Sequence, residues 1–184
     1  LVTEICGLLG SGRSSILLHI AAANLEHPNV HIIFVDFKKD IYMDRLKLFI
    51  QKHPWGCIAN LSEDVLPRVN ICRFTVVQEF LEFLEADLEK MIIEIRSKSQ
   101  TSIIILLIDN IALPFKWWTD LQPGDMIAAV KRISHQIRLL TSEFNLYTVV
   151  ANSMTRKLDI DKATRRLVRE YHVPSLGKPW IETI

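Results

Sequence analysis

The sequence lacks the patterns that define several common protein classes. Its three cysteines, Cys6, Cys57 and Cys72, form no even-numbered disulfide framework and have no metal-ligand spacing, so we expect reduced, buried thiols. The six histidines form no H-E-x-x-H pair. No apolar run is long enough to cross a membrane and no signal peptide is visible, so we expect no membrane partner. The formal net charge of +1 gives no global attraction to nucleic acid.

The composition is that of one globular domain. Residues 1–184 are enough to bury a sizeable core, and 49% of them are hydrophobic against 23% charged. Repeats and low-complexity linkers are missing. The chain starts at Leu1, directly on an expected strand, so we expect that a leading segment precedes it.

Strand-like and helix-like segments alternate along the chain. Apolar or β-branched runs predict strands at 1–6, 30–36, 69–72, 102–109 and 146–151. Helices are predicted at 14–25, 42–51, 75–98 and 125–144. The third has a capping-box start, and the last carries an apolar side formed by Ile127, Val130, Ile133, Ile137, Leu140 and Phe144. This alternation predicts an α/β fold with a mostly parallel sheet flanked by helices. The polar, basic stretch 153–172 is interpreted as a mobile loop or an irregular helix.

The first strand and helix are joined by GLLGSGRSS, which resembles the phosphate-binding pattern G-x-x-x-x-G-K-[ST]. Backbone N–H groups of such a turn converge on an anion, and the glycines allow close approach. The alternative is a glycine-rich turn without a ligand, which the strand–turn–helix context disfavours. The residues expected to hold a nucleotide are Gly7, Gly10, Ser11, Gly12, Arg13, Ser14 and Ser15.

Arg13 stands where the pattern has lysine. Arginine is also cationic, but its long planar fork cannot take the position of an ammonium group without displacing something. We therefore expect a loop that retains a nucleotide with poor catalysis.

A second motif is the buried strand IIILLID, which ends in Asp109. An acid at the carboxyl edge of a parallel sheet lies where ligands bind and could hold Mg²⁺. Capping of the next turn is the alternative role for a lone aspartate. Together with the loop, the motif predicts a site for ATP and Mg²⁺, with Ser14 and Asp109 as metal ligands.

These pieces together resemble the eukaryotic recombinases of the RecA superfamily, and especially their paralogues that do not form filaments. The resemblance covers nearly the whole chain, and its four segments are Ile5–Ser15, Leu107–Lys116, Leu139–Lys157 and Pro174–Trp180. It implies that residues 1–184 form one RecA-like ATPase core, with closing strands expected beyond it.

Three positions depart from the pattern of that family. Its water-polarising glutamate aligns with Lys38, its γ-phosphate-sensing glutamine with Ser153, and its loop lysine with Arg13. A lysine cannot orient water as an acceptor at neutral pH. The resemblance therefore implies at most a weak ATP hydrolase.

The family's two DNA-contacting loops fall near Lys116–Thr119, with Trp117 and Trp118, and on 153–172. The second loop offers the DNA-binding candidates Arg156, Lys157, Lys162, Arg165, Arg166 and Arg169. Each has an ordinary alternative, because a basic loop can simply be solvated and tryptophans are common at protein interfaces.

The sequence thus favours a nuclear recombinase-paralogue subunit. Such a subunit would act with sister paralogues, the recombinase filament and single-stranded DNA in homologous-recombination repair. One alternative is an active DNA-stimulated ATPase in which Asp36 or Asp40 replaces the glutamate. Another is a nucleotide kinase with Arg165–Arg169 as its lid.

Overall fold

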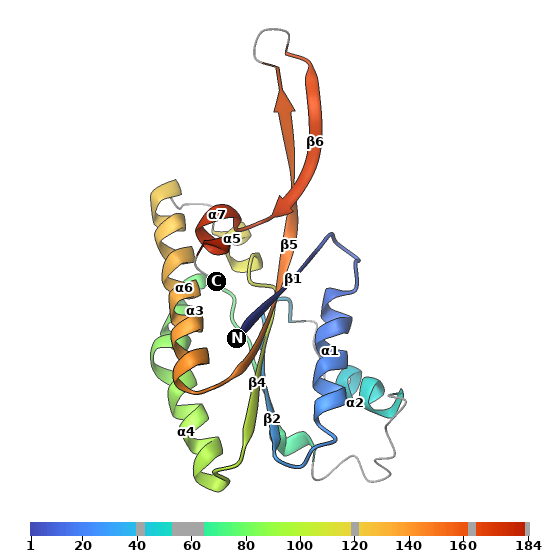
Figure 1. Ribbon diagram of the computed structural model, residues 1–184, viewed down its shortest axis with the longest axis vertical. Coiled ribbons are helices and arrows are strands. Elements are labelled where there is room, and N and C mark those ends of the chain that lie inside the picture. The colour runs from blue at the N-terminus through green and yellow to red at the C-terminus, as the bar shows by residue number, and fades with distance from the viewer. Residues whose placement is uncertain (40–42, 53–64, 119–121, 162–164, 183–184) are drawn as a thin grey trace.

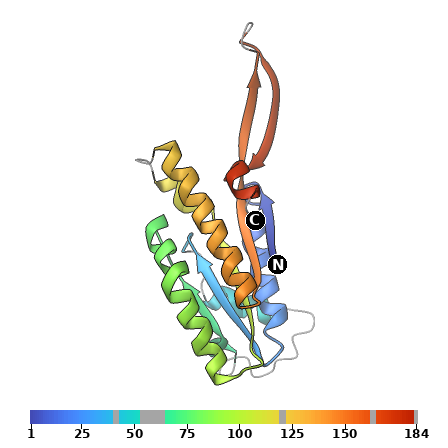
Figure 2. The same ribbon diagram turned by 60° about the vertical axis from the view of Figure 1, so that its left-hand side comes forward.

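The computed structural model describes residues 1–39, 43–52, 65–118, 122–161 and 165–182 (Figures 1 and 2). Helices and strands alternate over most of the chain, as the sequence predicts. The strands are β1 (Val2–Gly7), β2 (Val30–Asp36), β3 (Val69–Cys72), β4 (Ile103–Asp109), β5 (Tyr147–Ile160) and β6 (Leu167–Pro174). The helices are α1 (Arg13–Asn24), α2 (Met43–Lys52), α3 (Val77–Glu82), α4 (Leu88–Lys98), α5 (Leu113–Trp117), α6 (Pro123–Glu143) and α7 (Gly177–Ile181), with a short 3-10 turn, η1 (Leu66–Arg68), and a π-helical turn, η2 (Phe83–Asp87).

Five strands form a parallel sheet in the order β1-β5-β4-β2-β3, and β6 pairs antiparallel with β5. β4 lies at the centre with five of its seven residues aliphatic and fully or almost fully buried, as is typical of a strand covered on both faces. In register, Asp36 at the end of β2 lies beside Asp109 at the end of β4. The α/β prediction is confirmed, and the carboxyl ends of the strands bring the expected site residues to one edge.

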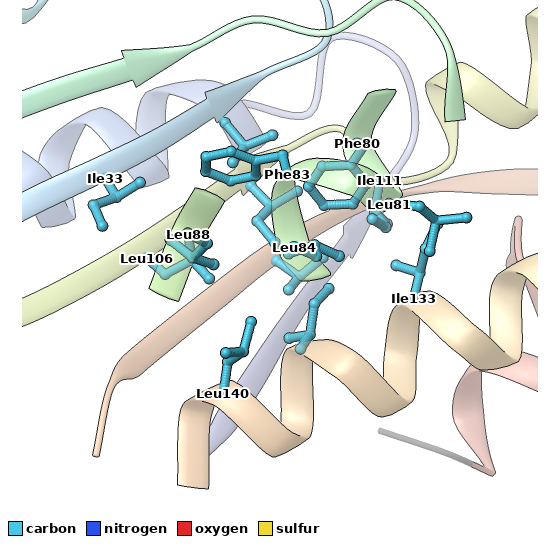
Figure 3. Packing of buried hydrophobic residues seen from close by; sticks show 14 of the residues in the cluster. Ile33, Phe80, Leu81, Phe83, Leu84, Leu88, Leu106, Ile111, Ile133 and Leu140 are labelled. Carbon is cyan, nitrogen blue, oxygen red and sulfur yellow. The ribbon is translucent and has the colours of Figure 1, made fainter. Parts of the chain in front are cut away.

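Helices cover both faces of the sheet. Figures 1 and 2 show α1 and α2 on one face and α3, α4 and α6 on the other. The larger of two buried clusters lies under α3, η2, α4 and α6, where Phe80, Leu84 and Ile133 meet side chains of the sheet (Figure 3). The smaller cluster packs α1 and α2 on the opposite face. None of the helices in the described ranges is long and apolar enough to cross a bilayer.

Two details of the helix predictions are wrong. The expected capping box is not formed, because the Val76 cap has no side-chain hydrogen bond and the Glu79 carboxylate instead accepts the Thr75 N–H at 3.3 Å. Ile127, expected on the apolar side of α6, is 45% exposed. It lies in the second turn of α6, where the neighbouring Met126 and Ala129 pack against the core instead.

The stretch expected to be a loop or an irregular helix is instead a β-hairpin. β5 continues beyond the sheet to Ile160, and β6 returns antiparallel to it, with Met154 opposite Pro174 and Asp159 opposite Arg169. The hairpin projects beyond the body of the molecule in both views (Figures 1 and 2). Polar and apolar residues alternate along β5 only from Lys157 to Ile160, which is the period of a strand rather than of a helix.

Glu4 joins the first strand to the end of the described chain. Its Oε1 accepts hydrogen bonds from Asn152 Nδ2 at 2.8 Å and from Trp180 Nε1 at 2.7 Å. Trp180 is fully buried, so its indole N–H has no water to bond. One carboxylate thus connects β1, β5 and α7.

Replacing this carboxylate should test its structural role. We expect Glu4→Ala to lower the free energy of unfolding by about 2–4 kcal/mol, because two buried donors lose their acceptor. Glu4→Gln keeps an acceptor oxygen and should lose less. Urea denaturation of both variants, with Thr3→Ala on the exposed side of β1 as control, measures the difference. Equal losses for the alanine and glutamine variants would contradict this assignment.

Candidate functional site

The loop between β1 and α1 has the backbone of a phosphate cradle. Gly10 and Gly12 adopt φ values of 79° and 85°, in the left-handed region that favours glycine. A Cβ at Gly7 would lie 3.1 Å from Ser11 Cβ, so the loop closes tightly only with glycine there. α1 begins at Arg13, so its free N–H groups face the loop. A hollow of about 200 Å³ lies here, lined by Leu9, Gly10, Ser11, Gly12, Arg13, Ser14, Ser15, Lys38 and Arg45.

Arg13 turns back across its own loop. Its Nη1 donates to the Leu8 carbonyl oxygen at 2.9 Å, and the residue is only 6% exposed. Its Nε is buried without a hydrogen-bond acceptor among the described residues. A buried donor without a partner is costly, so an acceptor entering the hollow would stabilise this side chain.

Lys38 lies at the centre of the site. Its Nζ donates to Ser14 Oγ at 2.8 Å and to Asp109 Oδ2 at 3.3 Å, and it lies 3.0 Å from Asp109 Oδ1. Asp109 is fully buried, so its charge needs a cation in direct contact with it. The structure therefore brings Ser14 and Asp109 together, as the sequence predicts, but around an ammonium group.

The turn after β2 holds Lys38 in this position. Asp36 Oδ1 accepts the backbone N–H groups of Lys38 at 3.1 Å and of Lys39 at 2.9 Å. The N–H of Phe37 donates to the Asp109 carbonyl oxygen at 2.8 Å. The Phe37 ring is fully buried, and its centroid lies 4.9 Å from that of Phe80 in an edge-on contact. Backbone and core together therefore direct Lys38 toward Ser14.

The expected magnesium ion does not fit this arrangement. Mg²⁺ binds oxygen ligands at about 2.0–2.1 Å in a near-octahedral shell. An ion between Ser14 Oγ and the Asp109 carboxylate would take the space of the Lys38 Nζ, which is within 3.3 Å of all three oxygens. The two cations would also repel each other across a short distance.

The position expected to sense a γ-phosphate is used for structure. Ser153 is 8% exposed, and its Oγ accepts a hydrogen bond from Asn110 Nδ2 at 2.5 Å. The Ser153 carbonyl oxygen accepts the N–H of Ser175 at 2.8 Å. The neighbouring Asn152 binds Glu4. Neither Asn152 nor Ser153 lines the hollow, where the longer glutamine side chain of the resembling family would sense a phosphate.

The described candidate DNA-binding residues lie on the hairpin of β5 and β6, which projects beyond the body of the molecule (Figure 1). Because paired residues share a face of a ribbon, Lys157 and Tyr171 lie on the same face as Asp159 and Arg169. The Arg169 guanidinium lies 5.3 Å from the centroid of the Tyr171 ring. Arg156 lies on the opposite face, where its Nε is 2.9 Å from Glu170 Oε1.

The turn of the hairpin carries the other basic candidates. Arg165 has a φ of 55°, and its N–H donates to the Asp161 carbonyl oxygen at 2.8 Å. The carbonyl oxygen of Arg166 accepts the Asp161 N–H. Lys162 falls outside the described residues, as does Thr119 of the first expected loop.

The two adjacent tryptophans border an apolar pocket of about 350 Å³. Trp117 is 51% exposed and Trp118 37% exposed, and both line it with Val76, Val77 and Pro114. An apolar pocket beside exposed tryptophans is typical of a protein contact surface.

One site residue, Arg45, was missed from the sequence. It lies on α2 and lines the same hollow as Arg13 and Lys38. The signal was present, because Arg45 lies only seven residues after Lys38, which aligns with the glutamate of the family.

Comparison with known proteins agrees with the motifs and the fold. No protein-family model matches the chain. It is 23% identical to the DNA repair protein RAD51 homolog 4 of mouse (Mus musculus) and 21% identical to that of cattle (Bos taurus), over 179 residues in each case. These alignments cover 97% of this chain. This similarity is weak but extends along nearly the whole chain, and it agrees with the resemblance to the recombinase paralogues of the RecA superfamily. The chain spans about half the length of these relatives, 51% in each.

Cys6, on the strand that enters the loop, offers a pH-dependent test of this geometry. It is exposed, contrary to the expectation of a buried thiol, and yet burial of its sulfur and then the Glu4 carboxylate raise its pKa to about 11. With Cys57 and Cys72 replaced by serine, alkylation by iodoacetamide should rise about tenfold per pH unit from pH 8 to 10, because only the thiolate reacts. A plateau near pH 9 would contradict the proximity of Cys6 to Glu4.

Proposed function

We propose that this chain is a recombinase-paralogue subunit that assists homologous-recombination DNA repair within a heteromeric complex in the nucleus. In this proposal its phosphate-binding loop holds ATP and does not hydrolyse it at a useful rate. Similarity to RAD51 homolog 4 along nearly the whole chain supports a role in recombination repair. The contact of Lys38 with Ser14 and Asp109 carries the catalytic part of the proposal.

Hydrolysis needs an acceptor that orients water beside the γ-phosphate. Lys38 is a donor only and is already bonded to Asp109. Ser153 is bonded to Asn110. Position 38 therefore lacks the water-orienting carboxylate of the resembling family, and position 153 lacks its long amide side chain.

An active ATPase would need another acid in place of the missing glutamate. Asp36 is poorly suited, because it is fully buried, its Oδ1 accepts two backbone N–H groups and its Oδ2 lies 3.6 Å from Arg73 Nε. Hydrogen bonds to the charged form make a carboxylate a weaker base. Asp40, the other candidate, lies outside the described residues.

A nucleotide kinase is also disfavoured. Its arginine lid would have to close over the phosphates, whereas Arg165 and Arg169 lie on a hairpin that projects away from the sheet (Figures 1 and 2). If the chain is not a nucleotide kinase, a phosphotransfer assay should give no product.

The proposed partners are sister paralogues, the recombinase filament and single-stranded DNA. The Trp117 and Trp118 pocket supports a protein contact. So does the hairpin, where exposed apolar side chains gather near the tip: Leu158, Ile160, Leu167 and Val168. The hairpin face with Lys157, Arg169 and Tyr171 supports a DNA contact, because cations and an aromatic ring lie together on it.

Nucleotide retention without turnover is the first test. We expect ATP to bind and to be recovered unhydrolysed, and we expect Gly12→Asp to abolish binding because it strains the loop and adds a negative charge. Gly177→Asp is the matched control, since Gly177 also has a positive φ (63°) but lies in α7. Thin-layer analysis of bound radiolabelled ATP gives the result. Turnover that Asp109→Asn abolishes would overturn the proposal.

The hairpin can be tested through the salt dependence of DNA binding. The double variant Lys157→Ala, Arg169→Ala should weaken binding of single-stranded oligonucleotides and reduce the slope of log K against log salt by about 1.4, or about 0.7 for each lost phosphate contact. Fluorescence anisotropy at several salt concentrations measures both. Lys90→Ala with Lys98→Ala removes the same charge from α4 and should leave the slope unchanged. An equal effect of the two pairs would exclude a hairpin-specific contact.

A further inference from the structure

We propose that the Lys38 ammonium replaces the magnesium ion of a P-loop site, so that this chain binds a nucleoside triphosphate without a divalent metal. The inference rests on the proposed function, because it specifies how the loop would hold its nucleotide. The ligand class is a polyphosphate in its metal-free form.

The first observation is the position of the ammonium group. Lys38 Nζ lies between the serine hydroxyl and the aspartate carboxylate that are the expected metal ligands, at 2.8 Å from Ser14 Oγ and 3.0 Å from Asp109 Oδ1. An ammonium group has three N–H donors. Contacts to Ser14 and Asp109 use two directions, and Lys38 also lines the hollow in the loop, so a further N–H can meet a phosphate oxygen.

The second observation is that Lys38 is fixed in place before any ligand binds. Asp36 accepts its backbone N–H, and the adjacent Phe37 is fully buried against Phe80. The Lys38 side chain is 23% exposed, so the ammonium group is partly screened from water. A cation placed in this way loses little freedom when it binds an anion.

The third observation is the charge around the hollow. Three of the described side chains that line it are cations, Arg13, Lys38 and Arg45, and none of the described ones is a carboxylate. Asp109 is neutralised by its contact with Lys38. A triphosphate would thus meet Arg13, Arg45 and the ammonium group that Lys38 shares with Asp109, a net charge of +2 that offsets part of its own charge without a metal.

The fourth observation is a donor without an acceptor. Arg13 lines the hollow and is only 6% exposed. Its Nε has no hydrogen-bond partner among the described residues. A phosphate oxygen is the kind of acceptor that a guanidinium N–H binds best. A phosphate in the hollow would give this donor an acceptor once the Arg13 side chain turns toward it.

The test compares ATP binding in EDTA and in Mg²⁺ by equilibrium dialysis. For the unmodified chain we expect the two dissociation constants to agree within about threefold. Lys38→Ala frees Ser14 and Asp109 for a metal, so its binding should become at least about tenfold weaker in EDTA than in Mg²⁺. Mn²⁺ electron paramagnetic resonance should then detect a nucleotide-dependent metal site in Lys38→Ala and none in the unmodified chain.

Lys39→Asn is the matched control. It removes one positive charge from the adjacent residue, whose side chain is exposed and whose φ of 58° asparagine tolerates. Its affinity for ATP should remain independent of metal.

The outcomes separate this inference from the proposed function. Metal-independent binding that Lys38→Ala converts to metal-dependent binding supports the inference. Binding of ATP by the unmodified chain only with Mg²⁺ overturns it and leaves nucleotide retention intact. No binding in either buffer overturns both the inference and the proposed retention of nucleotide. Lys38 would then only fill the space of the ligand beside the loop.

Discussion

The ion pair between Lys38 and Asp109 is the contact on which the rest of this site depends. It neutralises a fully buried carboxylate at the centre of the sheet edge, and it uses the serine hydroxyl that a metal would need. Removal of one member of such a pair leaves a buried charge without compensation, which is strongly destabilising. The Lys38 ammonium group therefore has two roles. It stabilises the buried carboxylate at the end of β4, and it takes the place of the metal.

The other departures are consistent with that replacement. A site without a metal and without a water-orienting acid has no use for a γ-phosphate sensor, and Ser153 is bonded to Asn110 instead. Arg13 can pair with phosphate oxygens as a fork, and Arg45 adds a third cation to the hollow. The loop keeps the features that hold an anion, namely its left-handed glycines and the start of α1, while the residues for bond cleavage have changed. In the proposed function, a nucleotide held in this way is retained and not hydrolysed.

Much of the fold could be predicted from the sequence, and the failures have physical reasons. Buried parallel strands such as β4 are continuous apolar runs, and β2 and β3 were predicted with their observed bounds. The hairpin was missed because β6 and the end of β5 are largely exposed and mix polar with apolar residues, so they lack the continuous apolar run of a sheet core. For the site, the sequence brought Arg13, Lys38 and Asp109 into one hypothesis. The hydrogen bond from Lys38 to Ser14 could not be predicted, because it depends on a turn fixed by Asp36 and Phe37.

The most direct test of the account is a crystal structure of the chain grown with ATP and Mn²⁺, with anomalous data collected to locate the metal. The account predicts ATP phosphates in the hollow, with Lys38 Nζ in contact with a phosphate oxygen and no anomalous peak between Ser14 and Asp109. A manganese ion bound to both residues, with Lys38 turned away, would contradict it.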